Sequence, residues 1–212
     1  MSADTDKVGR IIGQTLKTSG FGNKTSQQVI QTLHNYYKAV LRWNERLHLT
    51  TIVDPHAFAK RHICEALEIE SRIVNAPREL WDIGSGLGIP GIPIAIVRPE
   101  LPVVLVEAGR KKALYLDETF RELGLVNVRV INQTFEPEMI PDGVVLTARA
   151  VEKMRSLIDS FLSTPARQIL VLGSTELFSS NLNPEWQLSR TLLPGTQNSY
   201  LYNLHSNVPR GT

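Results

Sequence analysis

The stretch LWDIGSGLGIPGIP, residues 80–93, constrains the fold more than any other feature of this chain. A short apolar run with one acid passes there into a loop with four glycines and two prolines. Glycine lacks the Cβ atom that would keep a ligand away from the backbone. A helix that follows such a loop offers free N–H groups at its first turn. The pattern therefore indicates the strand, turn and helix that hold a ligand in a doubly wound sheet.

From Glu79 onward, short β-rich runs alternate with segments of helix length. Such alternation is typical of a parallel sheet covered by helices on both faces, and the fold class is α/β, doubly wound and mostly parallel. The last two runs, EWQLSR and NSYLYNLH, predict an antiparallel hairpin on the sheet edge. The expected strands are LWDI, PVVLVEA, NVRVIN, GVVLTAR and RQILVLG. One helix is expected to start at Gly91, a second to span KKALYLDETFRELG with Gly124 as its C-cap, and a third to span EKMRSLIDSFL.

The first 76 residues predict a helical extension. Apolar residues within 26–47 recur every three to four positions, which indicates one amphipathic helix with Ser26 or Thr25 as its N-cap. A second helix is expected to start after Asp54-Pro55 and to run to about Ile69. We therefore expect an extension of residues 1–76 and a ligand-binding domain of residues 77–212, packed as one compact unit.

Composition narrows the class of protein further. The 212 residues, 42% of them hydrophobic, suffice for one packed core with an appendage. The single cysteine, Cys64, excludes an internal disulfide and, without a close group of histidines, argues against a structural zinc site. Neither a secretory signal nor an apolar run of membrane-spanning length is visible. A cytoplasmic protein that binds no membrane is expected, and a monomer is favoured.

Charge is distributed unevenly along the chain. Residues 1–61 carry nine Lys/Arg and four Asp/Glu, a net charge of +5, whereas the rest carries fourteen and seventeen, a net charge of −3. The N-terminal part is therefore where an anionic polymer would bind. An ordinary solvated helix face with several lysines explains the same excess, and charge alone favours that reading.

The glycine spacing leaves two cofactor classes open. Gly86-x-Gly88-x-x-Gly91 matches the dinucleotide fingerprint, but its first glycine should follow the strand directly, and Gly84 holds that place. Asp82 at the strand end would repel a pyrophosphate and would attract the sulfonium and ammonium groups of S-adenosylmethionine. Glu107 ends the next strand, where an acid accepts hydrogen bonds from ribose hydroxyls in either class.

A longer stretch resembles a known family. The segment WDIGSGLGIPGIP, the strand end at Glu107 and the Arg-Lys-Lys after it look like the cofactor-binding core of the bacterial glucose-inhibited division protein B family. The likeness extends to RWNERLHLTTIVDPHAFAKRHICEAL and to LTARAV, and it covers about residues 30–175. The resemblance implies a methyltransferase domain that takes S-adenosylmethionine and methylates guanine N7 in the RNA of the small ribosomal subunit.

The resemblance also implies roles for individual residues. The loop residues and Glu107 would hold the methionine and ribose groups, Phe135 and Glu136 would lie along the adenine, and Arg149 would line the pocket near the substrate. His62, Lys111, Lys112 and Arg149 are candidates for positioning the RNA. A purely structural role is the alternative: His62 would pack between helices, and the lysines would belong to a solvated first helical turn. The expected cofactor-binding residues are Asp82, Gly84, Ser85, Gly86, Gly88, Ile89, Glu107, Phe135, Glu136 and Arg149.

Three positions depart from the family pattern. Thr134 and Gly173 stand where the family has cationic side chains, and Glu65 stands where it has Asp. Fewer phosphate contacts would lower RNA affinity and its dependence on salt. The chain thus resembles a diverged member whose cofactor pocket is better preserved than its RNA face.

Guanine N7 carries a lone pair and no proton, so its methylation needs no general base. The sequence shows no convincing base constellation, although Asp82, Glu65 and His62 stay open as candidates. Two other functions also stay open: a protein that binds the cofactor without methylating ribosomal RNA, and an NAD(P)-dependent oxidoreductase.

Overall fold

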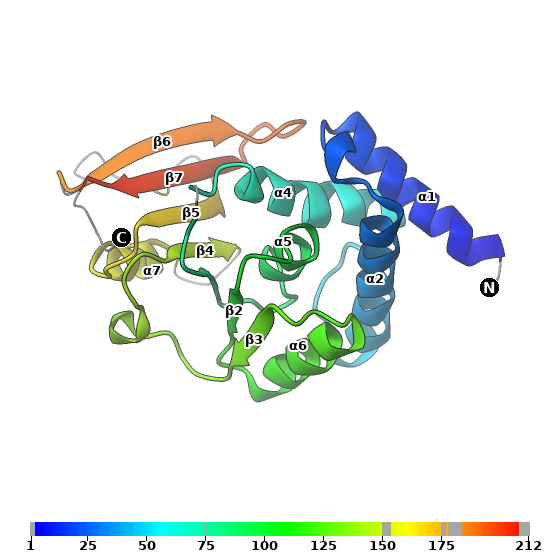
Figure 1. Cartoon of the computed structure of the whole chain (residues 1–212), viewed down its shortest axis with the longest axis horizontal. Helices are drawn as coiled ribbons and strands as arrows, with labels where there is room; N and C mark the ends of the chain where they lie inside the picture. The colour runs from blue at the N-terminus through cyan, green and yellow to red at the C-terminus, as the bar shows by residue number, and fades with distance from the viewer. Residues whose placement is uncertain (1–2, 75, 150–153, 175–176, 178–183, 208–212) are drawn as a thin grey trace.

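The computed structural model of the chain contains a central seven-stranded sheet flanked by helices (Figure 1). It describes all residues except 1–2, 75, 150–153, 175–176, 178–183 and 208–212. The strands lie in the spatial order β3-β2-β1-β4-β5-β7-β6. Their bounds are β1 Leu80–Ile83, β2 Val103–Val106, β3 Val128–Ile131, β4 Val145–Arg149, β5 Gln168–Gly173, β6 Trp186–Leu192 and β7 Tyr200–Ser206.

The strand pairing confirms the predicted fold class. Strands β1 to β5 pair in parallel, while β7 pairs antiparallel with both β5 and β6. The predicted hairpin is therefore confirmed, and it extends the sheet beyond β5 (Figure 1). The chain builds the sheet outward in both directions from β1 and β4. In such sheets a ligand binds at the carboxyl ends of the strands where the order reverses, here between β1 and β4.

Capping explains where several helices begin. The Ser26 side chain accepts a hydrogen bond from Val29 N at 3.3 Å, and Asp54 accepts one from Ala57 N at 2.8 Å, as the sequence predicted. Gly124 follows α6 with a φ of +68°, as a C-cap glycine does. The helices are α1 Ala3–Thr18, α2 Gln27–Leu47, α3 Pro55–Phe58, α4 Glu65–Glu70, α5 Gly91–Val97, α6 Arg110–Glu122 and α7 Met154–Leu162, with 3-10 turns at Gly22–Lys24 and Pro137–Met139.

Two helical segments differ from the sequence-based expectations, and a third agrees with them over its described residues. The helix expected from Pro55 to about Ile69 is interrupted by a π-helical turn, Ala59–Cys64. Helix α1, with Ile12 and Leu16 fully buried, lies within the extension but was not predicted as a separate element. The expected helix that starts at Glu152 is observed as α7, and positions 152–153 lie outside the described residues.

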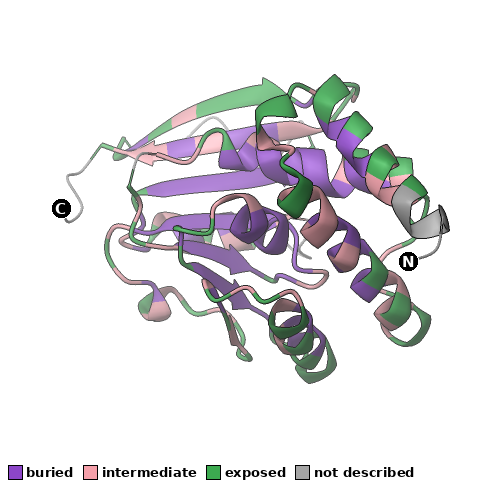
Figure 2. Cartoon of the chain, turned by 45° about the vertical axis from the view of Figure 1, so that its right-hand side comes forward, coloured by how far each residue is buried: buried purple, intermediate pink, exposed green. Residues whose placement is uncertain are grey.

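Two apolar clusters cover the two faces of the sheet. Alternate residues of β1 face opposite sides, so Leu80 packs with one cluster, while Trp81 and Ile83 pack with the other. The first cluster joins Leu80 to residues of α1 and α2, and Figure 2 shows the buried sides of these helices. Extension and sheet thus share one core, and the boundary near residue 76 stays a prediction. Within the described residues, no helix is both long and apolar enough to cross a bilayer.

Candidate active site

The loop after β1 uses glycine where the backbone requires it. Gly84, Gly86 and Gly88 have φ angles of +69°, +50° and +86°, a region that residues with a Cβ rarely adopt. These are the alternate positions that the sequence singled out. Gly91 has another role, because it begins α5 so close to β1 that a Cβ would lie 2.9 Å from Asp82 Oδ2. The register therefore follows Gly84-x-Gly86-x-Gly88.

Glu107 fixes this loop from the neighbouring strand. Its Oε2 accepts a hydrogen bond from Gly86 N at 2.9 Å, and its Oε1 accepts one from Gly109 N at 2.8 Å. Each carboxylate oxygen can accept a second hydrogen bond. Glu107 also lines a cavity, so its carboxylate shapes the loop and has acceptor capacity on the cavity wall.

Asp82 lies beneath the loop rather than on the cavity wall. The residue is fully buried; its Oδ2 accepts a hydrogen bond from Gly91 N at 3.0 Å, and its Oδ1 has no partner among the described residues. Burial raises the pKa of this carboxyl to about 7. The contact that the structure shows for Asp82 is with the start of α5, and its direct part in ligand binding stays a prediction.

The larger of two cavities beside the glycine loop has a volume of about 410 Å³. The loop after β1 forms one wall, and residues of the extension and the end of β4 form the other. A basic and an acidic side chain, Lys112 and Glu107, face the same space. The lining residues are Leu49, Thr50, His62, Gly84, Ser85, Gly86, Leu87, Ile89, Glu107, Lys112 and Arg149.

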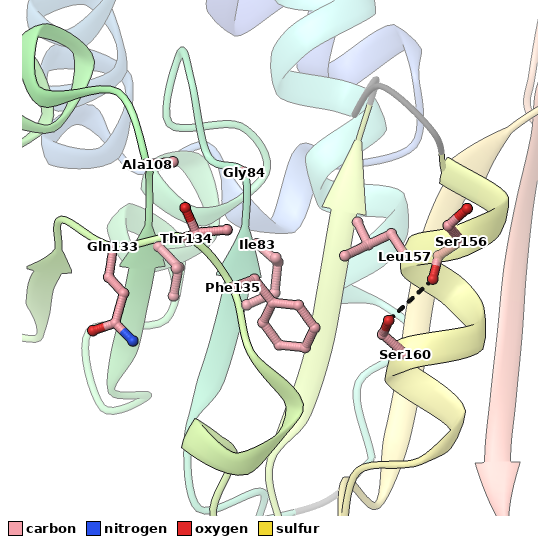
Figure 3. A pocket seen from close by; sticks show the side chains of 10 residues that line it. Ile83, Gly84, Ala108, Gln133, Thr134, Phe135, Ser156, Leu157 and Ser160 are labelled. Atoms are coloured by element: carbon pink, nitrogen blue, oxygen red, sulfur yellow. Dashed lines mark hydrogen bonds between the residues drawn. The ribbon is translucent and has the colours of Figure 1, made fainter.

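A second cavity, of about 320 Å³, lies on the other side of Gly84 and is mostly apolar. Figure 3 shows the Phe135 ring, Ile83 and Leu157 around it, with Thr134 near its edge. Phe135 packs edge-on against Phe161 with the ring centroids 5.2 Å apart, which fixes its orientation. The sequence reasoning missed Ser156, Leu157 and Ser160 of α7 and Gln133 after β3, since only the tertiary fold brings them here.

Arg149 ends β4 and is held by two side chains of the extension. Its Nη1 lies 2.9 Å from His62 Nδ1, and its Nη2 lies 3.0 Å from Glu65 Oε2. Burial raises the pKa of the Glu65 carboxyl and, together with the Arg149 charge, lowers the pKa of His62 to about 3. A cation with several N–H donors is thus fixed at the cavity wall.

Three further predicted site residues lie away from the walls of both cavities. Gly88 is buried within the loop, while Lys111 and Glu136 are exposed; none of the three lines either cavity. Their predicted contacts therefore stay predictions. A Cβ at Gly173 would overlap the side chain of Leu177, so the departure from a cationic residue there is matched by local packing.

The doubly wound sheet with a glycine loop after its first strand is the fold of a class of solved proteins, the S-adenosylmethionine-dependent methyltransferases. The structure is similar to that of a SAM-dependent methyltransferase from Aquifex aeolicus, with a TM-score of 0.54 at 13% identity over 74% of this chain and 97% of that one. It is also similar to a putative methyltransferase from Escherichia coli, with a TM-score of 0.52 at 16% identity over 67% of this chain and 84% of that one. At these identities the likeness shows the fold.

The chain belongs to the GidB family, described as rRNA small subunit methyltransferase G, whose model matches residues 29–177. The family resemblance seen in the sequence is thereby confirmed. A relative of that name from Chloroflexus aggregans is 35% identical over 160 residues, which are 73% of this chain and 66% of the relative. Another from Xanthomonas oryzae is 39% identical over 127 residues, 59% of each chain. The matches span less than two thirds of these relatives' lengths.

Proposed function

We propose that this protein transfers the methyl group of S-adenosylmethionine to guanine N7 in the RNA of the small ribosomal subunit. The observation that carries the proposal is the pair of cavities that meet at Gly84, one apolar and one lined by Glu107 and Arg149, in a chain of the GidB family. The apolar cavity fits an adenine ring. The polar cavity fits the ribose, the methionine group and the base to be methylated.

The residues present fit this cofactor. Glu107 retains acceptor capacity for the two ribose hydroxyls, and the φ angles of Gly84 and Gly86 bring backbone rather than side chains to the cavity. Phe135, Ile83 and Leu157 offer flat and apolar surface to an adenine. Asp82, fully buried behind the loop, anchors Gly91 and places partial negative charge near a cationic ligand.

Glu107 and the glycine loop would hold S-adenosylmethionine, which would supply an electrophilic methyl group on a sulfonium leaving group for attack by the N7 lone pair. The base takes up the positive charge and no proton leaves. The protein has then to align the two reactants and exclude water, which accounts for a large part of the catalytic effect in such transfers. The cavity walls formed by Arg149, Thr50 and Ile89 suit this task.

The state of His62 supports an acceptor that needs no base. Its Nδ1 is covered by the Arg149 guanidinium, and its Nε2 lies 3.0 Å from Thr50 Oγ1. With a pKa of about 3, the imidazole has little tendency to take up a proton at neutral pH. A ring nitrogen without a proton is the guanine atom that fits such a site.

Exposed cations near the larger cavity suit an RNA backbone. Lys112 lines the cavity, Lys111 precedes it on the first turn of α6, and Arg46 lies in the last turn of α2. Leu49 and Thr50, which follow the end of α2, line the same cavity as Lys112, so the end of α2 and the first turn of α6 border one site. Such contacts position RNA without reading its sequence. Ribosomal RNA as partner also implies a cytoplasmic protein, for which we propose a monomer.

Transfer of a labelled methyl group from S-adenosylmethionine to isolated small subunits, and to their RNA without protein, tests the proposal. We expect label in small-subunit RNA that digests to 7-methylguanosine, and none in large-subunit RNA. A Glu118→Gln variant, changed on the exposed side of α6, serves as the matched active control. Label in another nucleoside, or none with intact cofactor binding, overturns the proposal.

Thr134 and Gly173 favour one alternative, a protein that keeps the cofactor pocket without methylating ribosomal RNA, because both lack the cation of the family pattern. A thermal shift with S-adenosylmethionine but no label transfer would support it. A shift with NAD instead would support an oxidoreductase; a ligand at 100 times its Kd raises stability by about 2.7 kcal/mol.

A further inference from the structure

A chain of polar contacts links the extension to Arg149. Arg149 Nη1 lies 2.9 Å from His62 Nδ1, and His62 Nε2 lies 3.0 Å from Thr50 Oγ1. Asn44 closes the chain, since its side chain accepts from Thr50 N and donates to Thr50 O, both at 2.9 Å. The Arg149 side chain is only 15% exposed. Residues from α2, the following loop, the π-helical turn and β4 thus meet in one network.

The partners define the tautomer of His62. A guanidinium only donates hydrogen bonds, so Nδ1 must be the unprotonated acceptor and Nε2 must carry the proton. Nε2–H then donates to Thr50 Oγ1, which also accepts from Ile52 N at 3.0 Å. Burial and the charges of Arg149 and Arg61 lower the pKa of His62, which keeps the ring neutral and preserves Nδ1 as an acceptor.

The local fold fixes the imidazole ring. His62 lies in the π-helical turn Ala59–Cys64 and is 6% exposed. Its ring packs edge-on against Phe58, with the centroids 4.9 Å apart and the planes at 88°. π-helical turns often occur at functional sites because they redirect side chains. Here the turn puts His62 and Glu65 on the two ends of the same guanidinium.

We propose that His62 is a positioning residue, which orients the Arg149 guanidinium toward the ligand in the larger cavity and touches neither the methyl group nor the RNA itself. The inference rests on the proposed function. Both ring nitrogens of His62 are occupied by protein groups, so no nitrogen is left to accept a proton or to contact a phosphate. Glu65 fixes the other end of the guanidinium. With His62 and Glu65 both bound, the orientation of the guanidinium is set, and with it the direction of its remaining N–H groups.

A double-mutant cycle between His62→Phe and Arg149→Met tests whether His62 acts through Arg149. Phe keeps the packing on Phe58 but accepts no hydrogen bond. We expect His62→Phe to lower kcat/KM for methyl transfer about 10- to 100-fold, the range for a lost hydrogen bond to a charged group. In the Arg149→Met background the same change should have no further effect. Losses that multiply would show a direct role for His62 and would overturn the proposal.

Conservative replacements give a second readout. In His62→Asn the amide oxygen takes approximately the place of Nδ1, and we expect it to recover most of the lost kcat/KM. In His62→Gln the amide lies nearer Thr50 and should recover little. Equal recovery by Gln would contradict the proposal. Arg149→Lys replaces Arg149→Met in the cycle if the latter fails to fold, because a lysine keeps a cation beside Glu65 but cannot donate to both partners as a fork does.

A measurement that needs no activity separates this inference from the proposed function. The ¹⁵N chemical shifts of labelled imidazoles report tautomer and protonation, and the His62→Phe spectrum assigns the signal among the five histidines. We expect an Nε2–H tautomer that does not titrate between about pH 5 and 8. If the wild-type protein transfers no methyl group to RNA, the proposed function fails, but the spectrum still tests the contact between His62 Nδ1 and Arg149. A His62 signal that titrates in that pH range overturns the positioning role of His62.

Discussion

Tyr36 and Tyr115 donate hydrogen bonds to the same atom, the carbonyl oxygen of Leu87, at 2.8 and 2.9 Å. Tyr36 belongs to α2 in the extension and Tyr115 to α6, while Leu87 lies in the glycine loop. Both tyrosines are fully buried, and burial raises the pKa of each hydroxyl, so both stay protonated donors. The loop that borders both cavities is therefore held between two helices far apart in the sequence.

This clamp, formed by Tyr36 and Tyr115 on the carbonyl oxygen of Leu87, predicts that a double substitution lowers stability by more than the two single substitutions together. Tyr36→Phe leaves Tyr115 as a donor to Leu87, so we expect a loss of about 1 kcal/mol in the free energy of unfolding. Adding Tyr115→Phe removes the last of the two donors and should cost more than the sum of the single changes, with weaker cofactor binding. Urea denaturation and calorimetric titration measure both effects.

The matched control is Tyr37→Phe on the same helix. Tyr37 donates to Val53 O at 2.6 Å, outside the glycine loop, and its ring packs edge-on against Phe58. It should lose similar stability and bind the cofactor as the wild type does. Equal weakening of cofactor binding in Tyr36→Phe and Tyr37→Phe would rule out a clamp on the loop.

Gly88 predicts a steric effect beyond backbone strain. Its φ is +86°, and a Cβ there would lie 2.5 Å from Ile92 Cδ1 and 3.0 Å from Leu116 Cδ2. Gly88→Ala should therefore combine left-handed strain of roughly 1–2 kcal/mol with about 1–3 kcal/mol of overpacking. The free energy of unfolding from urea denaturation gives the total.

Gly20 offers the control for this change, because its φ is +90° and a Cβ there would meet no atom within 4 Å. Gly20→Ala should show the strain alone and leave cofactor affinity unchanged. Identical losses of stability in the two variants would mean that the space around Gly88 adjusts freely, contrary to the packing described above.

The loop register and the acid at Glu107 were predictable because both depend on local sequence. A strand followed by alternate glycines needs only residues 80–88, and the next strand end lies within the same unit. The π-helical turn and the contact between His62 and Arg149 were not predictable in this way. The two residues are 87 positions apart, and only the packing of the extension on the sheet brings them together.

Asp82 illustrates the same limit at a single residue. Its position at the end of β1 was evident from the sequence, but the direction of its carboxylate was not. Strand alternation and the close approach of Gly91 turn the carboxylate into the core, beneath the loop. A sequence gives the position of an acid along a strand, whereas tertiary contacts decide which atoms it meets.

Glu107→Gln tests the acid that joins loop and ligand. The carboxylate accepts from Gly86 N and Gly109 N through different oxygens, and an amide has only one oxygen to offer. One of the two N–H groups then faces an NH₂ group, and one acceptor for the ribose is lost. We expect cofactor affinity to fall about 10- to 100-fold in calorimetric titrations. The exposed Glu118→Gln variant should bind the cofactor with unchanged affinity. The same result for Glu107→Gln would show that Glu107 does not bind the cofactor.

Asp82→Asn should change how stability depends on pH. Burial raises the pKa of Asp82 from 3.8 to about 7, so the folded protein binds a proton that the unfolded chain has released between these values. Because the folded state binds more protons in this window, stability falls as pH rises, by roughly 1.4 kcal/mol per unit at most. Below the unfolded value both states are protonated and the cost of the buried charge is absent.

Asparagine does not titrate, and its side-chain oxygen can still accept from Gly91 N. The difference in unfolding free energy between wild type and Asp82→Asn should therefore shift in favour of the variant as pH rises from about 4 to 7, and stay constant above that. Urea denaturation at each pH measures the difference, in which other titrating groups such as Glu65 cancel. A difference that is flat across the window would show that Asp82 is ionised in the folded protein.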